Sequence, residues 1–262
     1  MITSSQNNRI KMIRALLTQR QERQQNKQYI IEGVRLVEEA VANGVKPTLV
    51  LYSIQLSDRG FQVLDMLQKS KTEIEEITPA LMHSLSETDT PQGILAVVPM
   101  QTSTLPEKPN FVVIADQIRD PGNMGTLLRT SLAAGVQAVI VTVGTTDVYA
   151  PKIVRSAMGA HFRLPLVECS WEEIRVWHQS SHPTPTFWIS DVREGTSCWD
   201  ANLRMPLILG IGGEAEGMSS TAFTLPHQKI HIPMPGQSES LNASIAAGVL
   251  IFEVIRQRSI SP

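Results

Sequence analysis

The sequence predicts an α/β protein whose second half contains a parallel β-sheet with helices on both faces. Two observations support this prediction. Runs of Val, Ile and Leu recur at residues 111–116, 138–144 and 206–213, without the polar alternation of a half-exposed strand. Segments of helical apolar spacing separate these runs, and this order is typical of strands buried on both faces of a parallel sheet.

The first hundred residues predict a smaller set of helices and strands. Residues 1–28 carry apolar side chains at helical spacing, namely Ile10, Ile13, Leu16 and Leu17. Residues 29–45 predict an amphipathic helix that ends at Asn43-Gly44 and whose apolar face comprises Val34, Val37, Ala40 and Val41. Strands and helices then alternate over residues 47–53, 60–70, 74–78, 79–87 and 93–100.

A polar, proline-containing stretch, QTSTLPEKPN, indicates a domain boundary. We place an N-terminal domain at residues 1–104, a linker at 105–110 and a C-terminal domain at 111–262. In the C-terminal domain the predicted strands are 111–116, 138–144, 186–192 and 206–213, and the predicted helices are 123–135, 151–160, 171–178 and 243–255.

Composition excludes several classes of protein. The polar start of the chain lacks the apolar core of a signal peptide, and no apolar run approaches the length of a membrane span. Two separate cysteines, Cys169 and Cys198, favour a cytoplasmic protein with free thiols. The six histidines form no metal-binding spacing, so we expect no metal.

The first chemical motif follows the strand at residues 111–116 and opens a helix. Its key residues are Asn123, Gly125 and Arg129, in the pattern N-x-G-x-x-x-R. Asn123 is a candidate N-cap. Arg129 lies about one and two-thirds turns further on, where it could face the loop or the solvent. The stretch lacks the GxGxxG fingerprint, which disfavours a dinucleotide-dependent oxidoreductase.

The second motif, LILGIGGEAEGMS, places glycines at the end of a buried strand, where open α/β sheets bind ligands. It lacks the GK[ST] of a phosphate-binding P-loop. Two carboxylates, Glu214 and Glu216, would repel phosphate. Their closeness in one loop does not show converging geometry, so catalysis by paired acids is also disfavoured.

The third motif, IPMPGQSESLN at residues 232–242, leads straight into the apolar helix at 243–255. Small polar residues before a helix start predict a ligand-holding loop, and the alternative is a capped core helix. The stretch contains no His, Cys or Lys. It therefore favours binding and positioning over nucleophilic or metal chemistry.

Taken together, the three motifs resemble those of the SpoU/TrmH branch of the SPOUT superfamily of RNA 2′-O-ribose methyltransferases. The likeness covers residues 111–255. It includes a connecting segment, VYAPKIVRSAMGAHFRLP, that has the family's Pro151, Arg155, Ser156 and Gly159. Residues 4–41 are similar to the small α/β substrate-binding domain of rRNA-modifying members, which is related to ribosomal RNA-binding proteins.

The resemblance implies a C-terminal trefoil knot and S-adenosylmethionine (SAM) as the cofactor. By motif position, the expected cofactor contacts are Gly212, Ile232, Gly236 and Leu241. The methyl group is expected to pass in line to a ribose 2′-hydroxyl, with a catalytic set comprising Arg129, Asn123, Glu214, Ser240 and Asn242. The resemblance also implies a homodimer, with the helix at 243–255 as a candidate interface.

One position departs from the family pattern. Ala215 follows the glutamate of the second motif, where many relatives have glycine. If this position requires a positive φ, alanine costs about 1 kcal/mol there.

RNA is the expected macromolecular partner. Residues 1–30 carry six basic side chains and one acidic one, which is typical of a polyanion-binding arm or of a solvated helix face. The candidate phosphate contacts are Arg9, Lys11, Arg14 and Arg23. We favour ribosomal RNA over transfer RNA as the substrate. The other alternative is a non-catalytic RNA-binding assembly factor.

Overall fold

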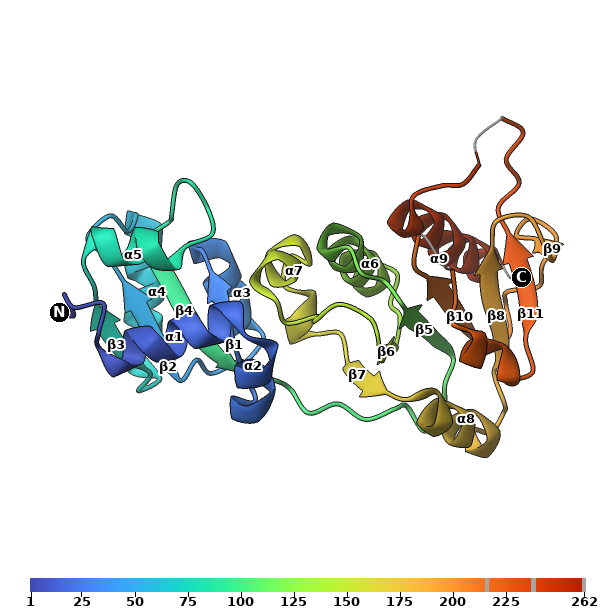
Figure 1. Ribbon diagram of the computed structural model, residues 1–262, viewed down its shortest axis with the longest axis horizontal. Coiled ribbons are helices and arrows are strands. Elements are labelled where there is room, and N and C mark those ends of the chain that lie inside the picture. The colour runs from blue at the N-terminus through green and yellow to red at the C-terminus, as the bar shows by residue number, and fades with distance from the viewer. Residues whose placement is uncertain (215–216, 237–238, 261–262) are drawn as a thin grey trace. The chain divides into compact units, whose positions relative to one another are not determined.

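A computed structural model of the protein describes residues 1–214, 217–236 and 239–260 (Figure 1). Its contacts define an N-terminal unit, Met1–Thr102 with Asp147–Arg163, and a C-terminal unit, Ser103–Thr146 with Leu164–Pro262. The division after Thr102 lies near the linker predicted from the sequence. Asp147–Arg163, however, groups with the N-terminal unit and not with the domain in which the sequence placed it.

The N-terminal unit is built on a four-stranded sheet in the order β1-β4-β2-β3. β4 pairs antiparallel with β1 and β2, and β3 pairs parallel with β2. The strands are β1 (Gln28–Glu32), β2 (Leu49–Tyr52), β3 (Glu73–Glu76) and β4 (Ile94–Pro99). β1 corrects the prediction from the sequence, which places residues 29–32 at the start of a helix.

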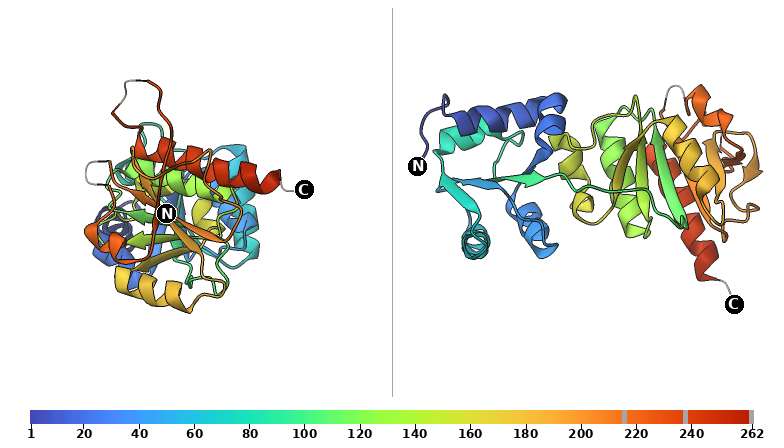
Figure 2. Two further views of the ribbon diagram at one scale, coloured as in Figure 1. Left: turned by 90° about the vertical axis from the view of Figure 1, so that its right-hand side faces the viewer. Right: turned by 90° about the horizontal axis from the view of Figure 1, so that it is seen from below.

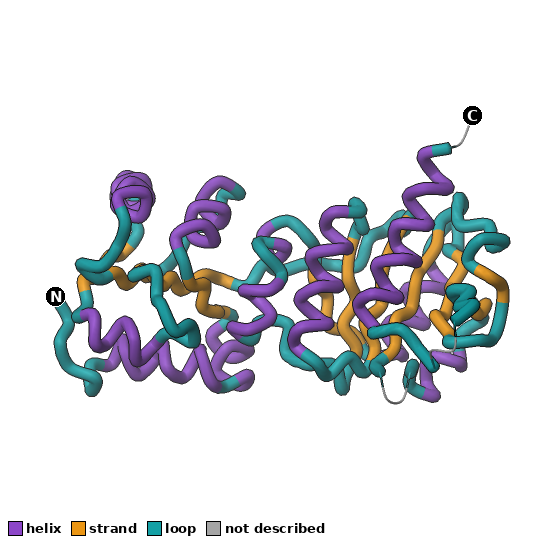
Figure 3. The backbone as a smooth tube through the Cα atoms, turned by 90° about the horizontal axis from the view of Figure 1, so that it is seen from above, coloured by secondary structure: helices purple, strands orange, loops and turns teal. Residues whose placement is uncertain are grey.

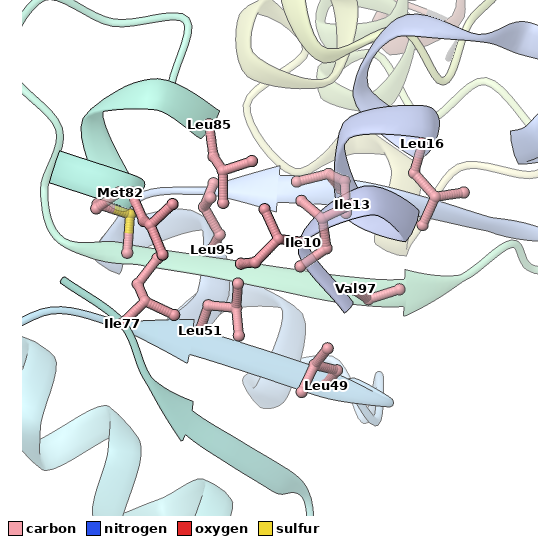
Figure 4. Packing of buried hydrophobic residues seen from close by; sticks show 12 residues of the cluster. Ile10, Ile13, Leu16, Leu49, Leu51, Ile77, Met82, Leu85, Leu95 and Val97 are labelled. Carbon is pink, nitrogen blue, oxygen red and sulfur yellow. The ribbon is translucent and has the colours of Figure 1, made fainter. Parts of the chain in front are cut away.

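Helices cover both faces of this sheet (Figure 2). The predicted N-terminal helix is two helices, because Gln19 has extended backbone angles between them. These two and α5 lie on one face, where α1 and α5 bury apolar side chains against the strands (Figure 4). α3 and α4 pack together on the other face. The helices are α1 (Asn8–Thr18), α2 (Arg20–Asn26), α3 (Val34–Ala42), α4 (Asp58–Lys69) and α5 (Pro79–Leu85).

The segment Asp147–Arg163 contains α7 (Pro151–Ser156) and the short 3₁₀ helix η1 (Ala160–Phe162). Arg23 on α2 donates to Asp147 Oδ2 through Nε at 2.8 Å and Nη2 at 2.5 Å, and both side chains are buried. The rings of Tyr29, Tyr149 and His161 pack with centroids 5.0–5.8 Å apart. These buried contacts explain why the segment belongs to this unit.

Acid is expected to destabilise the protein through His161. Burial lowers the pKa of its ring to about 4, against opposing effects of the Val148 carbonyl and the Asp147 carboxylate. As the pH falls, the unfolded chain therefore binds a proton on this ring near pH 6.5, whereas the folded chain binds it only near pH 4. The free energy of unfolding should fall by about 2 kcal/mol between pH 7 and pH 5 from this group alone.

Urea unfolding at the two pH values measures this effect. The variant His161→Gln has no ring to titrate, so its stability should depend less steeply on pH. Equal pH dependence in the two proteins would show that His161 does not carry the effect.

The C-terminal unit is built on a seven-stranded sheet in the order β7-β6-β5-β10-β8-β11-β9, and every pair is parallel. This confirms the predicted parallel sheet. The trefoil knot stays a prediction. The strands are β5 (Phe111–Asp116), β6 (Ala138–Thr142), β7 (Leu166–Cys169), β8 (Thr186–Asp191), β9 (Thr196–Ser197), β10 (Leu207–Gly212) and β11 (Gln228–His231).

Helices lie on both sides of this sheet (Figures 2 and 3). α6 and α9 pack against each other on one side, and α9 also contacts β10. On the other side, Ile174 of α8 and Ala222 of η2 join the apolar residues of the central strands. The helices are α6 (Pro121–Ala133), α8 (Trp171–Ser180), η2 (Ser220–Thr224) and α9 (Ala243–Ser259).

The remaining compositional expectations concern membranes and cysteines. None of the helices that the structure describes combines the length and the apolar character of a membrane span. Cys169 and Cys198 are buried free thiols, as expected. Burial raises the pKa of each to about 11, so neither is a reactive thiolate near neutral pH.

Candidate active site

The first motif begins helix α6, but its N-cap is not Asn123. The side chain of Asp120 accepts from the Asn123 backbone N–H at 2.8 Å, and Pro121 occupies the first helical turn. The capping role predicted for Asn123 is therefore wrong, since the residue three positions earlier fills it. The Asn123 side chain is left free to bind outside its own helix.

The three motifs meet through side-chain hydrogen bonds. Glu214 Oε1 accepts from Asn123 Nδ2 at 2.5 Å and from Asn242 Nδ2 at 2.8 Å. Asn242 Nδ2 also donates to Asn123 Oδ1 at 2.9 Å. We call this arrangement the motif triangle. One residue from each motif contributes to it, so segments distant in the sequence form one site.

Asn242 also begins helix α9. Its Oδ1 accepts from the backbone N–H groups of Ser244 and Ile245 at 3.0 and 3.2 Å. The amide oxygen thus caps the helix while the amide nitrogen joins the motif triangle. This dual role fixes the side-chain orientation and ties the start of α9 to the other two motifs.

A cavity of about 300 Å³ lies beside the motif triangle, at the carboxyl ends of β8 and β10. Glu214 belongs to both the triangle and the cavity wall. The cavity is also lined by the predicted residues Gly212, Ile232, Ser240 and Leu241. This is the sheet edge at which parallel α/β folds bind ligands. Gly236 lines an adjoining hollow of about 540 Å³ that shares Ile232 with the first cavity.

Sequence reasoning missed two acidic residues that shape this edge. Asp191 ends β8 and lines the cavity. Burial alone would raise its pKa, but the N–H groups of Glu194 and Arg193 and the Lys229 ammonium hold the pKa below its usual value. Its position at the end of a predicted buried strand was the available signal.

The other is Asp116, which ends β5 and is fully buried. It accepts from the Ser219 backbone N–H at 2.6 Å, from Trp171 Nε1 at 3.3 Å and from the hydroxyl of Thr142. Since Ser219 is the last residue of the second motif, this carboxylate anchors the end of that loop against the sheet.

Arg129 does not line the cavity of its own chain. It is exposed on α6, lines neither the cavity nor the adjoining hollow, and makes no hydrogen bond or ion pair with any residue that the structure describes. Residue 215, where the family pattern departs, and Glu216 lie outside the described residues.

The four predicted RNA contacts have different surroundings in the N-terminal unit. Arg23 is 4% exposed and pairs with Asp147, so it is unavailable to phosphate, and that prediction is wrong. Arg9 pairs with Glu73 and Glu75. Arg14 donates to Ser84 Oγ at 3.3 Å, and Lys11 is exposed.

Comparison with known proteins decides the family. The SpoU rRNA Methylase family model matches residues 110–252, which is more than half of the chain. The chain belongs to the SpoU rRNA methylase family. A second model, the MRM3-like substrate binding domain, matches residues 7–96 of this SpoU family member.

Relatives of known activity match almost the whole chain. The 23S rRNA (uridine(2479)-2′-O)-methyltransferase of Streptomyces viridochromogenes is 33% identical over 264 residues, covering 97% of this chain and 92% of the relative. The 23S rRNA (guanosine(2553)-2′-O)-methyltransferase RlmP of Bacillus subtilis is 29% identical over 262 residues, covering 97% and 98%.

Solved structures agree with this assignment. The SpoU methyltransferase AviRb from Streptomyces viridochromogenes, in complex with AdoMet, has a TM-score of 0.89 at 32% identity and covers 98% of this chain and 100% of its own. An AdoMet-bound rRNA methyltransferase from Sinorhizobium meliloti has a TM-score of 0.87 at 26% identity, with coverage of 100% and 98%.

Proposed function

We propose that the protein transfers a methyl group from SAM to a ribose 2′-hydroxyl of ribosomal RNA. The observation that carries the proposal is the motif triangle beside a cavity at the carboxyl ends of parallel strands. The relatives named above are 23S rRNA 2′-O-methyltransferases, and the structural neighbours were solved with AdoMet. When bound, SAM supplies the electrophilic methyl group.

The cavity fits this cofactor because its walls combine apolar side chains with closely packed backbone. A Cβ placed on Gly212 would lie 2.3 Å from the Gly217 carbonyl carbon and 2.4 Å from the Met218 nitrogen. Gly212 therefore lets two segments of the second motif approach each other directly. Ile232 and Leu241 supply apolar surface, and Asp191 offers a carboxylate.

The variant Gly212→Ala is expected to bind SAM about tenfold more weakly or worse, because the new methyl group must displace backbone that lines the cavity. Gly248→Ala is the matched control, since a Cβ there meets only Thr130 Cγ2, at 4.0 Å, and Gly248 lines neither the cavity nor the adjoining hollow. Isothermal titration with SAM compares them, and circular dichroism checks folding. Unchanged affinity in folded Gly212→Ala would remove this glycine from the cofactor site.

The side chains of the motif triangle position the reacting groups in this proposal. Asn123 and Asn242 are held in fixed orientation by Glu214, so their remaining hydrogen-bonding capacity and Ser240 can orient the target nucleotide. A guanidinium is a strong hydrogen-bond donor and has no acceptor for a proton. We propose that Arg129 binds the target phosphate and stabilises the developing alkoxide, in preference to acting as a general base.

We propose further that the active site is completed in a homodimer. α9 exposes Ile245 and Phe252, which are 55% and 50% exposed and lie seven residues apart on one helical face. The neighbouring helix α6 carries Arg129, which its own chain leaves outside the cavity. A second subunit covering α9 would bury the apolar pair and could bring in Arg129.

Sedimentation at micromolar concentration tests the dimer. We expect a mass near twice the 28.9 kDa of one chain. Phe252→Asp should shift the protein to monomers and reduce methyl transfer together. A fully active monomer would contradict this part of the proposal.

Mapping 2′-O-methylation across total RNA, with and without the protein, tests the function itself. We expect one protein-dependent site in 23S rRNA. A site in transfer RNA would favour the tRNA alternative, and RNA binding without SAM binding would favour an assembly factor. The cytoplasmic location that the cysteine content favours stays a prediction.

A further inference from the structure

A second cavity, of about 800 Å³, lies in the N-terminal unit and is separate from the proposed cofactor site. It is lined where β1 joins α3, by the loop between α5 and β4, and by α4 and α7. The family segment that contains Arg155 and Gly159 thus contributes to this cavity. No residue of that segment lines the proposed cofactor cavity. We call this cavity the α3 cavity.

Hydrogen bonds hold the walls of the α3 cavity in place. Glu32 at the end of β1 accepts from the Thr88 hydroxyl at 2.9 Å and also from the Ser86 hydroxyl. Gln92 Oε1 accepts from the Val34 backbone N–H at 2.8 Å, at the start of α3. The loop from residue 86 to 92 is therefore fastened to the β1–α3 junction, so a ligand would meet a preformed surface.

The polar lining offers both guanidinium and carboxylate groups. Arg35 is exposed and has no hydrogen bond or ion pair within the described ranges. Arg155 pairs with Glu87 at 3.2 Å, and its Nη1 is buried 3.8 Å from Glu32 without a hydrogen bond. Glu38 and Glu39 add carboxylates, which pair with Arg59 and Arg163 respectively. Donors and acceptors thus surround the cavity in similar number.

The cavity also has an exposed apolar surface. Met158 lines it, is 45% exposed, and has a φ of +48° in the left-handed region that non-glycine residues rarely adopt. Gly159 follows, and a Cβ there would lie within 2.6 Å of three atoms of the Glu39 carboxylate group. This tight packing of Gly159 against Glu39 keeps Met158 in its unfavourable left-handed conformation, with its side chain exposed at the cavity.

From this combination we propose that the α3 cavity binds one unpaired base of the RNA substrate. A nucleobase has an apolar face that suits Met158 and a polar edge that suits paired donors and acceptors. Mixed charge favours a base edge over phosphate, since three carboxylates and three guanidinium groups line the cavity and leave no net positive charge for an anion. This inference rests on the proposed function, because it assumes that RNA is the substrate.

The α1 surface fits the substrate less well. Arg9 and Arg23 are already paired with carboxylates of their own unit. At the α3 cavity, the guanidinium of Arg35 has no such partner among the residues described. Lys11 and Arg14 have no carboxylate partner among the residues described, so α1 keeps two candidate phosphate contacts. We assign base recognition by this unit to the α3 side of its sheet.

Steady-state kinetics of the full-length protein on unmethylated 23S rRNA transcribed in vitro test the inference. The variants are Arg35→Gln, which removes the unpaired donor, and Met158→Asn, which tolerates the left-handed backbone but removes the apolar surface. Each should raise the KM for RNA about tenfold to a hundredfold, with kcat and SAM affinity unchanged. Lys69→Gln at the end of α4 is the charge-matched control.

Filter binding of the same RNA gives a readout that is independent of methyl transfer and should show the same order of variants. Unchanged RNA affinity in both cavity variants would overturn the inference, as would a loss confined to Lys11→Gln and Arg14→Gln on α1. A wild-type protein that binds SAM and RNA but transfers no methyl group would instead contradict the proposed function.

Discussion

Replacing Arg129 by lysine is expected to lower the rate of methyl transfer about 100-fold to 1000-fold at saturating SAM and RNA. Lysine keeps the positive charge but loses the planar fork that binds a phosphate through two parallel hydrogen bonds. Because the proposed partner of Arg129 is the target phosphate and not the cofactor, SAM affinity should be unchanged. Single-turnover transfer from radiolabelled SAM measures the rate.

Arg175→Lys is the control for this experiment, since Arg175 is an exposed arginine on α8 paired with Glu172. We expect it to retain the wild-type rate. Near-wild-type turnover of Arg129→Lys with unchanged RNA affinity would show that the guanidinium fork is not required. Loss of SAM binding in this variant would indicate a structural role instead.

Truncating Asp147 to alanine is expected to destabilise the N-terminal unit by about 3–5 kcal/mol. The substitution leaves the buried Arg23 guanidinium with the backbone carbonyls of Leu16 and Leu17 but with no carboxylate among the residues that the structure describes. An uncompensated buried charge is costly because the guanidinium loses its hydration without gaining an anion. Chemical unfolding followed by circular dichroism measures the loss.

Two further variants make this measurement specific. Arg9→Gln removes two partly exposed ion pairs, with Glu73 and Glu75, and should cost less than about 1 kcal/mol. The double variant Arg23→Met with Asp147→Leu removes both charges and should recover much of the stability. If Arg9→Gln and Asp147→Ala lowered the free energy of unfolding equally, the unpaired Arg23 charge would cost no more when buried than an exposed charge does.

The sequence predicted strands best where burial leaves a continuous apolar run. β5, β6 and β10 are of this kind, and all three are buried along most of their length. β1 was missed because QYIIE runs directly into the apolar pattern of α3, and only the turn at Gly33, with a φ of +100°, separates them. Residues 28–32 form a strand because they pair with β4, and this tertiary contact is not visible in the local sequence.

The catalytic and cofactor-binding roles of the motif residues stay predictions, and the sequence did not show which of these residues contact one another. The motifs identified Asn123, Glu214 and Asn242, but nothing in the sequence showed that one carboxylate oxygen accepts from both amides. A run of basic residues likewise predicts positive charge, but it does not show which of the side chains pair with carboxylates in the folded protein. Arg23 and Asp147 are 124 positions apart, so their pairing depends on the fold.

The motif triangle joins three segments that are far apart in the sequence. Its members are separated by 91 and 28 positions, and the last of them also begins α9. During synthesis, a ribosome-bound chain that has not yet released residue 242 has neither the second amide for Glu214 nor the cap of α9. On the role proposed for the motif triangle, methyl transfer therefore begins only after residue 242 has left the ribosome.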